Sequence, residues 1–160
     1  MDERINRILS RVAAESLEKL AFIFSFPATD DDEMDYDSAV AARVFFKGPF
    51  SGKLVIITSN QILVELTSNM LGIDDDEKTT RGQQDDALKE TTNIICGNIL
   101  PALAGEEEVF HIDTPEIISG ADEIKNEIEG GNAQKPAGAA ELAIDDEKCA
   151  LYLFGDIVKQ

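Results

Sequence analysis

One segment near the middle of the chain constrains the fold most, because it must form a helix with two different faces. Between residues 86 and 104, positions suited to a core recur every three or four residues, at Leu88, Thr92, Ile95, Ile99 and Leu103. At about 100° per residue these positions form one stripe, which predicts an amphipathic helix packed on a core. Pro101 is expected to kink this helix or to end it early.

The other face of the same helix carries polar and small residues. Asp86, Glu90, Asn93 and Gly97 form a second stripe, which should face solvent or a partner. Glu90 and Asn93 are three residues apart, so their Cβ atoms should lie about 5–6 Å from each other. A glycine inside a helix costs about 1 kcal/mol relative to alanine and often marks a place of close approach. This face is a candidate site, although each residue taken singly would also suit an ordinary solvated helix.

Length and charge restrict the class of protein. The 160 residues suit one domain, spanning residues 1–160. The net charge is −18, from 32 acidic against 14 basic residues. That balance argues against a nucleic-acid partner and against an anionic membrane surface, because few basic groups are present to neutralise phosphates. It favours partners with exposed basic groups.

The two cysteines and the first residues bear on the cell compartment. Cys96 and Cys149 form no close pair in the sequence, so both are expected to be reduced and partly buried. The N-terminus lacks the apolar region of a signal peptide, and no run approaches the ~20 apolar residues of a membrane span. A cytoplasmic protein is expected.

Two more helices are predicted before the central one. Residues 3–24 have helical spacing of apolar side chains, and Pro27 should end that helix in a loop. Ser59 can cap a second helix, which should end at Gly72.

Four segments have the composition of strands, at residues 39–46, 54–58, 140–144 and 149–154. The glycines and proline of residues 47–53 should join the first two strands as a hairpin, and residues 145–148 should turn between the last two. A short extended piece is expected near 109–112, and a loop or strand edge at 115–120. Residues 121–138 are expected to be a mobile connection. The pattern predicts an α+β fold with a mostly antiparallel sheet packed against long helices.

The sequence gives little support for a metal-binding, histidine-based or phosphate-binding site. The acidic runs at 30–33 and 74–77 lack the spacing and the glycine of an EF-hand, so they read as solvated loops. His111 is the single histidine, which rules out a site built on several histidines. The sequence leaves open a catalytic pair in which Cys96 is the nucleophile and His111 is the base. Residues 48–53 lack the spacing of a phosphate-binding loop. No metal site is expected.

The pattern Asp86-x-x-x-Glu90-x-x-Asn93, followed by Ile94-Ile95-Cys96-Gly97-Asn98, resembles the CheX/CheC family of bacterial chemotaxis phosphatases. These proteins remove phosphate from the response regulator CheY, and residues 115–120 also resemble the family segment that follows its active-site helix. The resemblance implies a pseudo-repeated fold in which a helix followed by a hairpin occurs twice. The CheC type has two Glu-x-x-Asn sites and the CheX type has one. Glu18 stands where a second site would need asparagine, so the chain is similar to the CheX type, which is known to pair as a homodimer.

The resemblance also implies a role for each residue of the polar stripe. Asn93 would orient the attacking water, Glu90 would pair with the lysine of a phosphorylated CheY-like receiver, and no cofactor belongs to this chain because the receiver supplies Mg²⁺. Gly97 would allow close approach, and Asp86 would cap the helix or hold its first turn. The alternative is a non-catalytic adaptor or scaffold that docks on a receiver in chemotaxis or flagellar signalling. A homodimer is expected to form through sheet edges or hairpins, with residues 140–144 as a candidate exposed strand.

Overall fold

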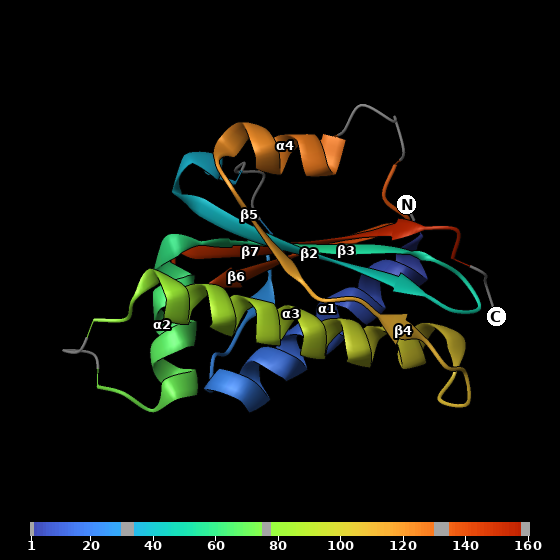
Figure 1. The fold of residues 1–160 in the computed structure, drawn as a ribbon, viewed down its shortest axis with the longest axis horizontal. Coiled ribbons are helices and arrows are strands. Elements are labelled where there is room, and N and C mark those ends of the chain that lie inside the picture. Colours follow the sequence, from blue (N-terminus) through green and yellow to red (C-terminus); the bar gives the residue numbers. More distant parts are fainter. Residues whose placement is uncertain (1, 30–33, 75–77, 130–134, 158–160) are drawn as a thin grey trace.

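The computed structural model describes residues 2–29, 34–74, 78–129 and 135–157. An antiparallel sheet lies at the centre of the fold, with helices on both faces (Figure 1). Its strands follow the order β1-β6-β7-β3-β2-β4, and β5 also pairs with β2. Their bounds are β1 (Phe26–Pro27), β2 (Ala39–Lys47), β3 (Gly52–Ser59), β4 (His111–Ile112), β5 (Glu116–Ser119), β6 (Gly138–Ile144) and β7 (Glu147–Gly155). The predicted α+β class with a mostly antiparallel sheet is confirmed.

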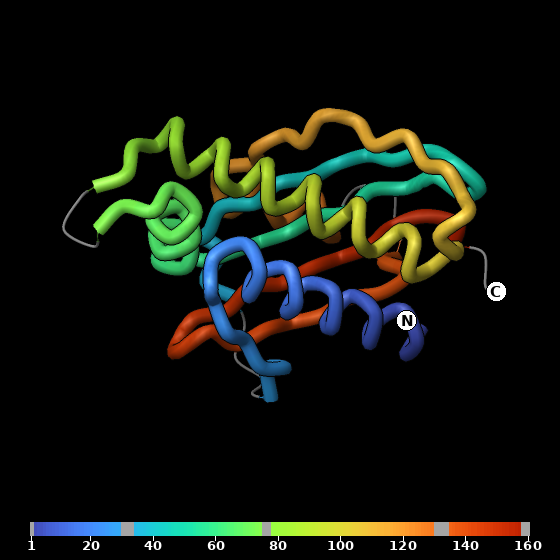
Figure 2. Tube along the Cα trace, turned by 90° about the horizontal axis from the view of Figure 1, so that it is seen from below, coloured from blue at the N-terminus to red at the C-terminus, as the bar shows by residue number. Residues whose placement is uncertain are grey.

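Three helices cover one face of the sheet, and a fourth covers the other (Figure 1). On the first face are α1 (Glu3–Ala21), α2 (Asn60–Leu71) and α3 (Arg81–Ala104), and on the second face is α4 (Ala121–Glu129). A short 3-10 helix, η1 (Tyr36–Ser38), comes directly before β2 in the chain. α1 and α3 lie side by side on the same face of the sheet (Figure 2). Asn98 of α3 donates a hydrogen bond of 3.5 Å to the Ser16 hydroxyl of α1. The larger core therefore lies between the sheet and the layer that contains α1, α2 and α3.

The first helix ends three residues earlier than predicted. Phe22 adopts a left-handed conformation with φ 53°, and its N–H donates to the Glu18 carbonyl at 2.9 Å. This cap turns the chain so that Ile23, 2% exposed, enters the core. Residues 26–27 form β1, a strand that the sequence pattern did not predict, because two residues give no alternation to detect.

The first hairpin is confirmed, with β3 beginning two residues before its predicted start. Its register pairs Phe46 with Gly52. A Cβ atom at Gly52 would lie 1.9 Å from the carbonyl oxygen of Phe154, in the neighbouring strand β7. A glycine is required at this position because the two backbones approach so closely.

The prediction of a mobile connection over residues 121–138 is wrong for its first half. Residues 121–129 form α4, which buries Ile124 completely against the second face of the sheet. Ile128, four residues later, packs against the same smaller core. The spacing of these two isoleucines marks a short amphipathic helix, whose signal the neighbouring glycines obscured. Residues 130–134 lie outside the described residues.

Strand β6 is not the exposed edge that the sequence suggested. β1 pairs with its end, where Pro27 faces Leu142. Near its start, the Ala139 N–H donates to the side chain of Asn6, at 2.8 Å. The N-terminal helix and β1 thus cover much of this edge, which removes β6 as a free site for strand addition.

Candidate functional site

The helix that carries the polar stripe begins five residues before Asp86. Thr80 caps α3, and its hydroxyl accepts a hydrogen bond of 3.1 Å from the Gln83 N–H. The Gln83 side chain in turn accepts from the Thr80 N–H at 2.9 Å, which completes a capping box. Asp86 therefore lies beyond the first turn, and the expectation that it caps the helix is wrong. The Thr-x-x-Gln pattern was a visible signal for the true start.

The apolar stripe of α3 packs as predicted. Leu88, Ile95, Ile99 and Leu103 are each no more than 2% exposed. Thr92 is fully buried, and its hydroxyl donates to the Leu88 carbonyl at 2.7 Å, which satisfies the polar group inside the core. With one face of the helix fixed against the sheet and α1, the opposite face is held in a defined orientation.

The structure places the polar stripe on this opposite face. Asp86, Glu90 and Asn93 are exposed and Gly97 is half-buried, at successive spacings of four, three and four residues. Within the described part of the chain, no hydrogen bond or ion pair engages the side chains of Asp86, Glu90 or Asn93. An acid and an amide are thus presented to the outside with their hydrogen-bonding capacity free.

Gly97 is not required by the packing of the chain itself. A Cβ atom built there would meet only Ile112 Cδ1 of β4, at an ordinary contact distance of 3.9 Å. Pro101 lies four residues later and has no N–H to donate to the Gly97 carbonyl, although α3 continues through it to Ala104. The backbone at Gly97 is therefore open on this face.

The strands β4 and β5 flank α3. The Arg81 guanidinium, in the first turn of α3, donates to the Ser119 hydroxyl at the end of β5, at 3.0 Å. It also pairs with Asp85 at 3.1 Å. These contacts fix the N-terminal part of α3 against the sheet edge.

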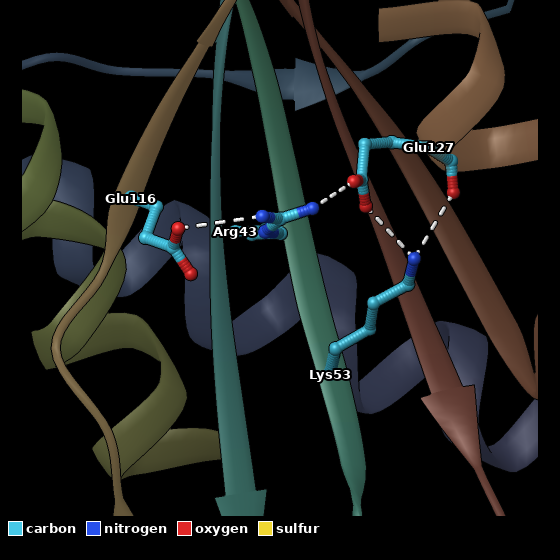
Figure 3. Close-up of polar contacts among 4 residues, drawn as sticks. All are labelled: Arg43, Lys53, Glu116 and Glu127. Carbon is cyan, nitrogen blue, oxygen red and sulfur yellow. Dashed lines mark hydrogen bonds and ion pairs between the residues drawn. The ribbon is translucent and has the colours of Figure 1, made fainter. Parts of the chain in front are cut away.

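A cluster of four charged residues holds β5 and α4 to the middle of the sheet (Figure 3). Glu127 of α4 accepts from both Arg43 of β2 and Lys53 of β3, the latter at 2.8 Å, and Arg43 also pairs with Glu116 of β5 at 3.3 Å. Burial alone would lower the pKa of Arg43, but the hydrogen bond with Glu116 and the two neighbouring carboxylates outweigh it and raise that pKa. Sequence reasoning missed this cluster, because its members are up to 84 residues apart.

Cys96 and His111 do not form a nucleophile and base. Cys96 is 1% exposed, and burial raises the pKa of its thiol to about 12. His111 is an exposed residue of β4 that lies 3.0 Å from Asp113. Cys149 is likewise buried, with a thiol pKa raised to about 12, and both cysteines are free as predicted.

Neither a metal cluster nor a membrane-spanning helix is found in the part of the chain that the structure describes. No group of three or more potential ligands from His, Cys, Asp and Glu is close enough there to hold a metal ion. None of the helices there is both long and apolar enough to cross a bilayer. The acidic run at 30–33 and residues 75–77 of the second run lie outside the described residues.

Comparison with known protein families shows the family to which this chain belongs. The family model described as "Chemotaxis phosphatase CheX" matches residues 40–135, which is more than half of the chain and includes all of α3. The chain belongs to the CheX family. A search of curated proteins finds no match.

Solved structures of CheX proteins share the fold. CheX from Vibrio vulnificus has a TM-score of 0.70 at 18% identity, with 97% of each chain covered. CheX from Desulfovibrio desulfuricans has a TM-score of 0.68 at 18% identity, covering 95% of this chain and 99% of that one. The CheX of a CheX-CheY-BeF3-Mg²⁺ complex from Borrelia burgdorferi has a TM-score of 0.66 at 19% identity, covering 93% of this chain and 96% of that one. The pseudo-repeated CheX fold therefore extends over nearly the whole chain.

Proposed function

We propose that this chain is a phosphatase that hydrolyses the aspartyl phosphate of a CheY-like receiver domain. Membership of the CheX family supports this class of activity. The observation that carries the proposal is the exposed pair of Glu90 and Asn93 on α3, neither of which has a partner in the described part of the chain. An acid and an amide without internal contacts are available to a docked protein.

Asn93 is the residue that positions the attacking water. Its amide cannot act as a general base near neutral pH, but it can both donate and accept hydrogen bonds and so hold a water in line with the phosphoryl group. The water oxygen bonds to phosphorus while the bond between phosphorus and the aspartate oxygen breaks. The products are inorganic phosphate and the free carboxylate of the receiver. The receiver supplies the phosphoryl group and the Mg²⁺ beside it, and this chain binds no cofactor.

Glu90 anchors the complex next to the reaction. We expect its carboxylate to form a charge-assisted hydrogen bond with the lysine beside the receiver's phosphoryl group. Gly97, two turns along the same face from Glu90, leaves the helix backbone open to close contact. The structure of a CheX with CheY, BeF3 and Mg²⁺ from Borrelia burgdorferi supports the partner class, since that protein shares the fold.

The deciding experiment measures phosphate release from a panel of phosphorylated receiver domains of the same cell, with and without this chain. The expected result is faster release from at least one receiver, proportional to the amount of chain added. Binding without any acceleration would instead assign the adaptor role. No acceleration and no binding with any member of the panel would reject the proposal.

A further inference from the structure

We draw no further inference here: the strongest candidate, the exposed apolar patch of Phe22, Phe24 and Phe26 where α1 leads into β1, is a surface for which nothing in the structure shows what covers it.

Discussion

The closest neighbour that a side chain at Gly97 would meet is Ile112 Cδ1, at 3.9 Å. The chain's own packing therefore tolerates alanine at this position, and we predict that Gly97→Ala raises the free energy of unfolding by about 0.5–1 kcal/mol. The added methyl group should weaken receiver binding by about 1–3 kcal/mol, because it fills space that the partner needs. Urea unfolding and calorimetry measure the two effects. Gly82→Ala, in the open first turn of the same helix, should stabilise the chain without affecting binding.

Asn93→Ala should lower the rate of phosphate release by about 10²–10³, because losing a group that positions a reactant commonly costs this much. Its exposed side chain has no partner in the described part of the chain, so stability and receiver affinity should change little. Stopped-flow release from the phosphorylated receiver measures the rate. Asn126→Ala, an exposed asparagine of α4, is the matched control. Wild-type turnover by Asn93→Ala would refute the water-positioning role.

Glu90→Ala should mainly weaken formation of the complex. Truncation of one member of a charge pair that becomes desolvated at an interface typically costs about 2–5 kcal/mol. Calorimetric titration with a receiver that carries a phosphoryl mimic measures the change. Glu15→Ala on α1 is a suitable control, because Glu15 is an exposed helical glutamate that pairs at the surface with Arg11, at 3.7 Å. An unchanged Kd would remove Glu90 from the interface.

Stability should fall as the pH rises above about 8.5. Burial raises the thiol pKa of Cys96 and Cys149 to about 12, whereas an unfolded thiol titrates near 8.5. Above that pH the unfolded chain releases protons that the folded chain retains, so the equilibrium shifts toward unfolding. Each thiol should cost about 1–2 kcal/mol between pH 8 and pH 10, as measured by urea midpoints. A Cys96→Ala, Cys149→Ala double variant should lose most of this pH dependence.

We also expect a homodimer in which each Asn93 stays accessible. The net charge of −18 per chain means that the contact must be largely apolar or main-chain, and that it should tighten as salt screens the repulsion. Because β1 and α1 cover much of the β6 edge, pairing should use another part of the sheet. Light scattering at low and high salt gives the mass. A monomer under both conditions, well above micromolar concentration, would contradict the expectation.

The strength of the local signal decided which elements the sequence could predict. The stripe from Leu88 to Leu103 was read correctly because each of its positions is buried against one surface. The start of α3 was misplaced because apolar periodicity was followed and the capping box at Thr80 was not. α4 was missed because its nine residues contain only one buried side chain, Ile124.

The same distinction between local and long-range signals applies to the candidate site. The face that carries Glu90 and Asn93 follows from helical spacing alone, so the sequence was sufficient to assemble it. Contacts between charged residues, such as Arg43 with Glu116, join strands that are distant in the sequence and depend on the sheet register. No local pattern encodes such a pair, which is why these contacts became visible only in the structure.

The two faces of the sheet differ in how firmly their helices are attached. α4 is held by one fully buried isoleucine, a small second core and the carboxylate of Glu127, whereas α1 and α3 share the main core. Local opening of a helix with so few buried contacts costs much less free energy than global unfolding. The amides of α4 should therefore exchange their hydrogens with solvent well before those of α3. Because Glu90 and Asn93 are on α3, the face that carries them should stay assembled while the opposite layer opens and closes.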